Sequence, residues 1–146
     1  MKYIVYILLF FPVWVTAQTY KYIGIEDGLS NRRIFNIQKD AQGYMWFLTN
    51  EGMDRYNGKD IKHYQLNKEG NTLDAPIRLG WLYTEPHIGI WVIGKQGRIF
   101  QYDANKDDFR MVYRLPDTSE TISCGYLDRN NNIWLCRKDT VLLYNI

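Results

Sequence analysis

The chain has 146 residues, of which 46% are apolar and 23% charged, so it is long enough for one domain and too apolar to remain disordered. Its formal net charge of +2 supplies no strongly basic surface of the kind that binds nucleic acid or anionic membranes. Aromatic residues make up 16% of the chain, with 12 tyrosines and 5 tryptophans, and because such residues favour half-buried pleated sheets the composition predicts an all-β fold.

The first 17 residues form a segment of their own. Lys2 precedes a nearly unbroken apolar run from Tyr3 to Val15, and Val15-Thr16-Ala17 is a small-residue site of the kind that signal peptidase cuts. The run, about 13 residues long, is too short to cross a bilayer core of roughly 30 Å as a helix. We expect residues 1–17 to be a cleaved secretory signal, which predicts a periplasmic or other extracytoplasmic location and no membrane span after cleavage. An uncleaved membrane anchor is the alternative.

Tryptophan recurs at a nearly constant interval in the rest of the chain. Trp46, Trp91 and Trp134 are 45 and then 43 residues apart. Such a period, with several short strands in each unit, is typical of the blades of a β-propeller. Each of these tryptophans has an acidic residue six positions before it, a glycine or threonine six positions after it, and a tyrosine at the end of the next strand. These residues are Asp40, Glu85 and Asp128; Gly52, Gly97 and Thr140; and Tyr56, Tyr102 and Tyr144.

The repeat predicts a partial β-propeller over residues 18–146, with about three blades of antiparallel sheet. The blades are expected at about residues 31–66, 77–115 and 121–146, separated by polar linkers that carry turn residues. A lone strand is expected at residues 20–25, and the last blade lacks its fourth strand. The strands within the blades are predicted at residues 34–39, 44–49, 53–56 and 61–66; at 77–84, 89–93, 98–102 and 109–115; and at 122–127, 133–136 and 141–144.

Three blades are too few to close a ring, which usually takes about four to eight. In closed propellers the first strand of the chain often completes the last blade and thereby hides exposed sheet edges. The strand predicted at residues 20–25 would have that role. The remaining blades would come either from a longer parent chain or from other copies of this chain.

The first repeat resembles the two-component regulator propeller repeat. The matching residues are Gly28-Leu29-Ser30, Asp40, Gly43, Trp46, Thr49, Gly52, Arg55, Tyr56 and Gly58. The mature chain is similar to the opening of the periplasmic sensor region of hybrid two-component system histidine kinases, strongly in the first repeat and more weakly in the next two. The resemblance implies a large parent protein anchored in the inner membrane, with oligosaccharides as ligands. Kinase activity would then belong to the parent protein and not to this chain.

Ligand-binding residues are expected where the repeat breaks down. The repeated tryptophans are interpreted as packing residues between sheets, and the acidic residues of the repeat as caps of their own turns. In propellers the loops from the second strand to the third, and from the fourth to the next blade, lie on one face around the channel. We call that face the rim. The predicted ligand-binding residues are the polar residues of the rim together with Trp81, which has no counterpart in the other repeats. They are Arg32, Arg33, Asn50, Glu51, Arg78, Trp81, Lys95, Gln96 and Lys138.

The rim chemistry suits a sugar. Arg33 and Arg78 occupy the same repeat position, where two guanidinium groups could bind a hydroxylated or acidic sugar. Trp81 stands alone in its repeat position and could stack on the ligand. A merely solvated surface is the alternative. Apart from its Thr49–Glu51 loop, the stretch from Asp40 to Gly58 is expected to pack the blade and not to contact the ligand.

Two cysteines and two histidines complete the set of candidate residues. Cys124 and Cys136 flank Asn130 symmetrically, so they could face each other across a hairpin and form a disulfide in an oxidising compartment. Two buried thiols are the alternative. His63 and His87 have no further ligand at metal-binding spacing, so no metal or cofactor is expected.

These patterns together predict an exported, ligand-sensing propeller, the carbohydrate-sensing input region of a two-component system, with no catalytic residue of its own. A secreted propeller enzyme acting on polysaccharide is one alternative, for which the loops supply no clear acid, base or metal site. A structural or protein-binding propeller is the other, and it would present apolar loops.

Overall fold

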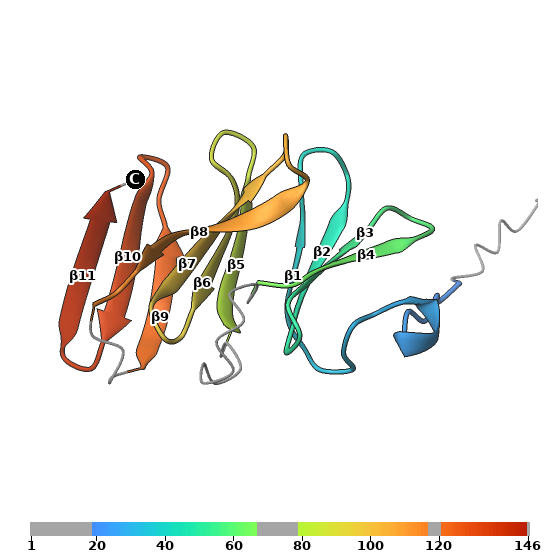
Figure 1. The fold of residues 1–146 in the computed structure, drawn as a ribbon, viewed down its shortest axis with the longest axis horizontal. Helices are drawn as coiled ribbons and strands as arrows, with labels where there is room; N and C mark the ends of the chain where they lie inside the picture. The colour runs from blue at the N-terminus through green and yellow to red at the C-terminus, as the bar shows by residue number, and fades with distance from the viewer. Residues whose placement is uncertain (1–18, 67–78, 117–120, 146) are drawn as a thin grey trace, which may run out of the picture.

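The computed structural model describes residues 19–66, 79–116 and 121–145. The predicted signal segment, residue Arg78 and most of both linkers lie outside these ranges. The described residues form three antiparallel sheets of four, four and three strands, placed one after another along the longest axis of the molecule (Figure 1). This arrangement confirms the predicted all-β partial propeller with an incomplete third blade.

Each sheet is a meander of consecutive strands. In all three sheets the spatial order follows the chain, so in the third sheet β10 lies between β9 and β11. The strands are β1 (Ile34–Lys39), β2 (Met45–Thr49), β3 (Met53–Tyr56) and β4 (Ile61–Tyr64); β5 (Leu79–Glu85), β6 (Gly89–Gly94), β7 (Arg98–Asp103) and β8 (Asp108–Arg114); and β9 (Ile122–Leu127), β10 (Asn132–Arg137) and β11 (Thr140–Asn145).

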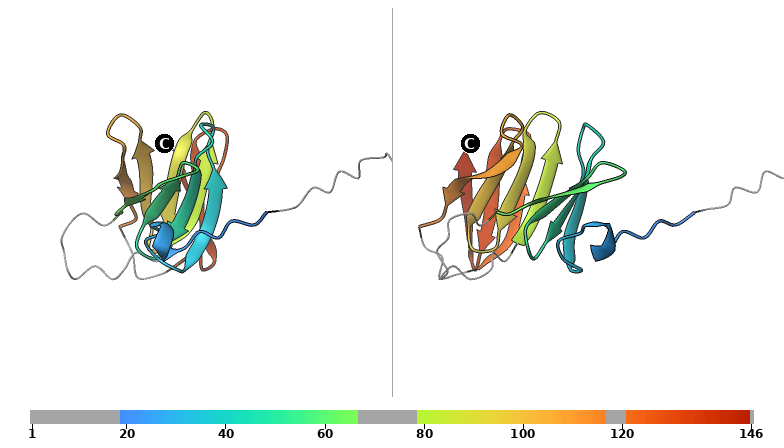
Figure 2. Two further views of the ribbon diagram at one scale, coloured as in Figure 1. Left: turned by 90° about the vertical axis from the view of Figure 1, so that its right-hand side faces the viewer. Right: turned by 45° about the vertical axis from the view of Figure 1, so that its right-hand side comes forward.

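The first strands of the three sheets are the innermost strands of the propeller sector. β5 contacts both β1 and β9, and the two further views show the sheets stacked beside one another (Figure 2). The turns β1–β2, β5–β6, β7–β8 and β9–β10 lie at one end of the sheets, which we call the turn end. The turns β2–β3, β6–β7 and β10–β11 lie at the other end, the predicted rim.

The strand predicted at residues 20–25 is wrong. Residues 20–24 have no regular secondary structure, and a short 3₁₀ helix (Ile25–Asp27) begins where the strand was expected to end. Tyr20 and Tyr22 are 82% and 91% exposed. A strand requires a neighbouring strand to bond its backbone N–H and C=O groups, and no described strand pairs with these residues. A role for these residues in completing a last blade stays a prediction.

The second sheet is buried on both faces. Alternate residues of a strand point to opposite faces, so Ile90 and Val92 of β6 join the core shared with the first sheet, whereas Trp91 and Ile93 join the core shared with the third. The apolar run of β6 therefore reflects burial on two sides. The first and third sheets are covered on one side only by the described residues.

The repeated tryptophans differ in burial for this reason. Trp46 and Trp91 are 0% and 1% exposed because the next sheet covers each of them, and this confirms their interpretation as packing residues. Trp134 is 39% exposed, and Tyr126, Val141 and Leu143 of the same sheet are also exposed. No described sheet follows the third one.

The acidic residues of the repeat cap their turns in two of three cases. Asp40 accepts hydrogen bonds from the backbone N–H groups of Gln42 (3.0 Å) and Tyr44 (2.9 Å) and from Trp46 Nε1 (2.7 Å). Asp128 makes the equivalent set of bonds with Asn130, Asn132 and Trp134. Glu85 departs from the prediction, because Trp91 Nε1 donates to the carbonyl oxygen of Ile88 instead (2.8 Å). The carboxylate of Glu85 is thereby left at the surface.

Cys124 and Cys136 are directly opposite each other in the β9–β10 ladder. Their Cα atoms are 5.0 Å apart, and the two sulfurs are joined in a disulfide. The bond links the first two strands of the third sheet.

The glycine that follows β2 is required for a close approach of backbone. Gly52 has a φ of 140°, and a Cβ atom at this position would lie 2.2 Å from the carbonyl oxygen of Tyr64. Gly43 also has a positive φ, 93°, but has open space around it. The two glycines therefore share a backbone conformation that would strain any residue with a Cβ atom, and they differ in the contact that such an atom would make.

We expect Gly52→Ala to lower the free energy of unfolding by about 3 kcal/mol, because backbone strain adds to the displacement of β4. Gly43→Ala is the matched control and should cost about 1 kcal/mol from strain alone. Urea denaturation followed by far-ultraviolet circular dichroism measures both values. Equal losses in the two variants would show that the contact with Tyr64 has no energetic weight.

Candidate functional site

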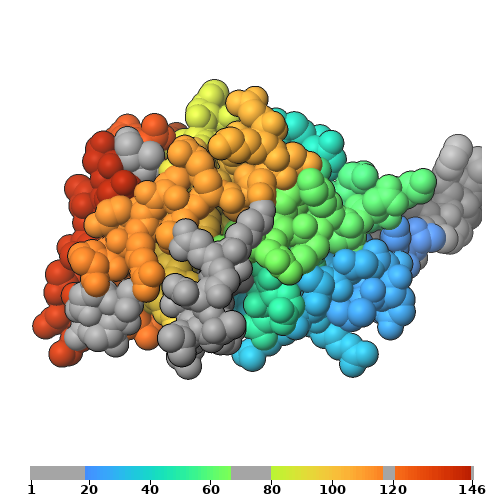
Figure 3. Space-filling view, in the orientation of Figure 1, coloured from blue at the N-terminus to red at the C-terminus, as the bar shows by residue number. Residues whose placement is uncertain are grey.

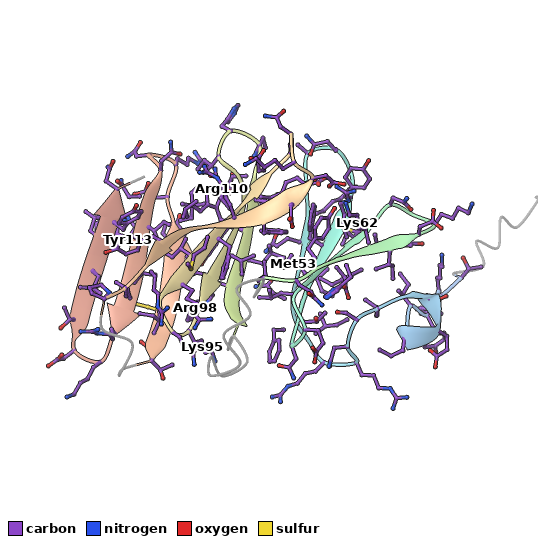
Figure 4. The ribbon with its side chains drawn as sticks, viewed as in Figure 1. Met53, Lys62, Lys95, Arg98, Arg110 and Tyr113 are labelled. Atoms are coloured by element: carbon purple, nitrogen blue, oxygen red, sulfur yellow. A yellow bond between two sulfur atoms is a disulfide. The ribbon has the colours of Figure 1, made fainter. Side chains whose placement is uncertain are left out.

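The predicted ligand-binding residues lie at the rim, spread over three turns. Arg32, Arg33, Asn50 and Glu51 are exposed at the rim end of the first sheet. Asn31 orders this group, since its side-chain amide lies 3.5 Å from Glu51 Oε1 and its Oδ1 accepts a hydrogen bond from the Arg33 backbone N–H (2.8 Å). Lys95 and Gln96 occupy the β6–β7 turn, and Lys138 the β10–β11 turn; Figure 4 labels Lys95 at this end.

Trp81 packs between two sheets, which was not predicted from the absence of a tryptophan at its position in the other repeats. It is half-buried and packs against the core between the second and third sheets. A Cβ atom on Gly125 would lie 3.3 Å from its indole ring, so this glycine leaves room for the ring. Stacking of Trp81 on a ligand stays a prediction, as does the part of Arg78, which lies outside the described residues.

A buried polar network holds the Gly-Leu-Ser motif against the first sheet. Asp54 of β3 is 0% exposed. Its Oδ2 accepts hydrogen bonds from the backbone N–H of Ser30 (2.8 Å) and from Ser30 Oγ (2.9 Å), and its Oδ1 lies 2.7 Å from His63 Nδ1. Thr49 Oγ1 lies 2.9 Å from Ser30 Oγ.

The three residue types of this network are those of a hydrolase triad, but the order is different. In a catalytic triad the histidine lies between the serine and the carboxylate and takes the serine proton. Here the carboxylate of Asp54 lies between Ser30 and His63, so the serine hydroxyl donates to an anion. The network therefore fixes the chain at Ser30 and activates no nucleophile.

A second polar cluster joins the first sheet to the second. Arg55 Nη1 donates to Tyr102 Oη (2.8 Å) and to Asp107 Oδ1 (2.9 Å). Asp107 also accepts hydrogen bonds from Lys62 Nζ (2.5 Å) and from Tyr64 Oη (2.8 Å). The space-filling view shows the residues around β4, in green, meeting those of the β7–β8 turn, in orange (Figure 3).

The Arg55 guanidinium also lies over aromatic rings. Its centre is 4.9 Å from the ring of Tyr44, 5.6 Å from that of Trp46 and 5.5 Å from that of Tyr64. Such contacts stabilise a cation by the negative face of each ring. The first sheet thus already holds a cation of its own in an aromatic environment.

The charges of this cluster follow from its contacts. Burial, together with hydrogen bonding to Asp107, raises the pKa of both Tyr64 and Tyr102 above the usual range of phenols. Hydrogen bonds from Lys62 and Tyr102 hold the pKa of Asp107 below the usual range of a carboxyl. At neutral pH the phenols are therefore neutral hydrogen-bond donors and the carboxylate is an ionised acceptor.

The lowered pKa of Asp107 has a consequence for acid stability. Because the folded pKa lies below the unfolded one, ionised Asp107 stabilises the fold above about pH 4 and this contribution is lost as the pH falls towards the folded pKa. We expect the difference in free energy of unfolding between wild type and Asp107→Asn to be largest near neutral pH and to shrink below about pH 4. Urea titrations at several pH values measure it, with Asp60→Asn as the exposed control.

A constant difference across the whole pH range would contradict this expectation, because it would show that Asp107 acts through shape and not through charge.

A cavity of about 280 Å³ opens between the first and second sheets at the turn end. Aromatic and apolar residues from both sheets form much of its wall, together with Arg55 and side chains of the β1–β2 and β5–β6 turns. The lining residues are Asp40, Ala41, Gln42, Tyr44, Trp46, Arg55, Thr84, Glu85, Pro86, Gly89, Ile90, Tyr102 and Ala104.

This cavity lies at the end opposite to the predicted rim. Six of its lining residues come from those parts of the stretch between Asp40 and Gly58 that were expected only to pack the blade. The interpretation from sequence was therefore incomplete. The sequence did carry a signal of this site. The residue paired with the repeated tryptophan is Arg55 in the first sheet, whereas it is Gln101 in the second sheet and Leu143 in the third.

The described residues contain neither a metal-binding cluster nor a membrane-spanning helix. No group of three or more His, Cys, Asp or Glu side chains is placed to hold a metal ion. Within the same ranges no helix has the length and apolar character needed to cross a membrane.

Comparison with known proteins gives both a family repeat and a fold. Residues 28–51 match the model of the two component regulator propeller. Histidine kinase P4 of Formosa agariphila is 35% identical over 46 residues, which are 32% of this chain and 3% of that protein.

The fold is shared with solved structures. The extracellular domain of a hybrid two component system from B. thetaiotaomicron has a TM-score of 0.60 and 23% identity over 80% of this chain and 17% of that one. The extracellular domain of a one component system from the same organism has a TM-score of 0.66 and 16% identity over 86% and 17%. Virginiamycin B lyase from Staphylococcus aureus has a TM-score of 0.59 and 19% identity over 81% and 43%.

The chain thus spans less than half the length of each of these proteins. At these identities the solved structures establish the fold, and the family model matches only the first repeat. The chain carries a two-component regulator propeller repeat, and its sheets are arranged as in the extracellular domains of a hybrid two component system and a one component system.

Proposed function

We propose that this chain is part of the extracytoplasmic sensor region of a two-component system and that it binds carbohydrate. The match of residues 28–51 to the two-component regulator propeller carries the proposal. The similarity to a histidine kinase in sequence, and to extracellular domains in fold, supports it. Further blades, the membrane anchor and the kinase would belong to a longer parent protein in the inner membrane, and the sensor would face the periplasm.

Carbohydrate is the ligand class that suits the exposed chemistry. Arg32 and Arg33 extend from the rim with guanidinium groups that can bind hydroxyl or carboxylate oxygens in pairs. Asn50, Lys95 and Lys138 add exposed amide and ammonium donors at the same end. We retain these residues as proposed contacts for an oligosaccharide.

A polysaccharide-cleaving or other enzyme is the main competing function, because the same fold occurs in a lyase. Fold alone does not decide between them, since function resides in sites and not in architecture. Two observations favour the sensor. The family repeat is that of a regulator propeller, and the two ionisable clusters described above are arranged to bind and to hold structure.

The experiment is a binding screen with the purified chain from Gln18 onward. Neutral and acidic oligosaccharides are titrated by isothermal calorimetry, and thermal unfolding is recorded in parallel. A ligand that binds only the folded chain should raise the midpoint of unfolding with its concentration. Arg32→Ala/Arg33→Ala should weaken binding of acidic oligosaccharides by about tenfold, whereas Arg129→Ala, at the turn end, should not. Absence of binding across the whole panel would overturn the carbohydrate proposal.

A further inference from the structure

The cavity at the turn end differs in kind from the rim. It is a partly open hollow between two sheets, whereas the rim residues lie on exposed loops and turns. Its volume of about 280 Å³ is at the small end of ligand pockets, which hold roughly 300–1,000 Å³. A single ring fits such a space and a long oligosaccharide does not.

The walls of the cavity favour a ligand with an apolar face. Tyr44, Trp46 and Tyr102 contribute aromatic surface, and Pro86 and Ile90 of the second sheet contribute apolar surface. A pyranose ring presents a face of C–H groups that packs on such surfaces, with its hydroxyl groups directed outward.

Charge excludes ionic ligands of either sign. A cation would meet the guanidinium of Arg55, which already lies over Tyr44 and Trp46. An anion would meet the carboxylates of Asp40 and Glu85 in the lining, while the positive charge of Arg55 is balanced by Asp107 at 2.9 Å. A neutral ligand avoids both costs.

Hydrogen-bonding groups remain available for such a ligand. Both bonds of the Arg55 guanidinium come from Nη1, and within the described residues no bond uses its Nη2 or Nε donors. The side chains of Gln42 and Glu85 are exposed at the cavity and have no partner in the described part of the chain. Together they offer donors and acceptors, which is what the hydroxyl groups of a sugar require.

The repeat shows that a junction between two sheets can form without these residues. At the second junction Gly89 stands at the position of Tyr44, and Gln101 at the position of Arg55. Gln101 accepts a hydrogen bond from Arg110 (2.6 Å), and the second and third sheets still pack closely. Tyr44 and Arg55 are therefore features of the first junction and not of the blade in general.

We propose that the cavity between the first and second sheets is a second binding site, separate from the rim, for one neutral sugar ring. The choice of ligand class rests on the proposed function. The ring would pack on Tyr44 and Tyr102 and would be bound through its hydroxyl groups by Arg55, Gln42 and Glu85. Because it contacts two sheets at once, it also stabilises their junction.

The test uses a substitution that closes the cavity without touching the cluster. Ala104 is exposed in the β7–β8 turn and lines the cavity, whereas its neighbour Asn105 is exposed and does not. Ala104→Trp should place an indole in the cavity, and Asn105→Trp is the matched control. Methyl glycosides of glucose, galactose and mannose are the probes, with tetramethylammonium and glucuronate as charged competitors, and binding is followed by saturation-transfer NMR and calorimetry.

We expect at least one methyl glycoside to bind wild type and Asn105→Trp alike and to bind Ala104→Trp at least about tenfold more weakly. Circular dichroism and urea denaturation of both variants confirm that they are folded. Equal binding by the two variants, or tighter binding of a charged competitor than of any glycoside, would overturn the cavity site. If oligosaccharides bind but no methyl glycoside does, the cavity site fails and the proposed function stands; if no saccharide binds at all, both fail.

Discussion

Replacement of Trp46 by alanine is expected to lower the free energy of unfolding by about 4 kcal/mol, and the same replacement at Trp134 by only about 1 to 2 kcal/mol. The two residues occupy the same repeat position, and each indole donates a hydrogen bond to the acidic residue of its own turn, at 2.7 Å for Asp40 and 2.9 Å for Asp128. They differ in what covers the ring.

The cover of Trp46 comes from the second sheet. Its ring centroid lies 5.1 Å from that of Tyr102 and 5.8 Å from that of Phe109, and the residue is 0% exposed. Trp134 is 39% exposed on the outer face of the third sheet. Deleting the buried ring removes its transfer energy and leaves a cavity, whereas deleting the exposed ring leaves little space unfilled.

Urea denaturation followed by far-ultraviolet circular dichroism measures both losses without using tryptophan as the reporter. Sedimentation at the same protein concentration is the control. Equal losses at the two positions would mean that Trp134 is covered in solution, and sedimentation would show whether another copy of the chain provides that cover.

Replacement of Asp54 by alanine is expected to cost about 3 to 5 kcal/mol. Asp54 is 0% exposed, and its carboxylate accepts hydrogen bonds from the backbone N–H and the hydroxyl of Ser30 and is hydrogen-bonded to His63 Nδ1. Its removal leaves the Ser30 donors without an acceptor and leaves His63 Nδ1 without its hydrogen-bond partner. Asp60→Ala is the matched control and should change the free energy by no more than about 0.5 kcal/mol, because Asp60 is exposed.

Hydrogen exchange distinguishes a local role of Asp54 from a general loss of stability. The backbone amide of Ser30 donates a hydrogen bond to Asp54. In Asp54→Asn the exchange of this amide should therefore accelerate more than the exchange of the β6 amides. Uniform acceleration across all strands would contradict a role in anchoring the Gly-Leu-Ser motif.

The strands were predictable because the repeat constrains them three times over. A tryptophan, a glycine or threonine in the next turn, and a tyrosine near the end of the next strand recur at nearly fixed spacing, and each sheet must present equivalent surfaces to its neighbours. The lone strand at residues 20–25 was wrong for a related reason. It belongs to no repeat within the chain, and without a neighbouring strand an alternating apolar pattern does not make a strand.

The candidate sites were much less predictable, because their members are distant in the sequence. Arg55 and Asp107 lie on different sheets, and Ser30 reaches Asp54 only because the segment before β1 packs against β3. Glu85 looked like its counterparts Asp40 and Asp128, yet in the structure the indole of Trp91 bonds to a carbonyl oxygen and the carboxylate remains free to face the cavity.

The amino-acid sequence by itself determined the fold class, the number of sheets, the turns between strands and the family of the first repeat, since these depend on local patterns that recur. Only the tertiary structure decided which surfaces meet. It buried Trp46 and left Trp134 exposed, and it formed a cavity beside Arg55 at the turn end, because such features arise where one sheet covers another and no single repeat contains both sides of that contact.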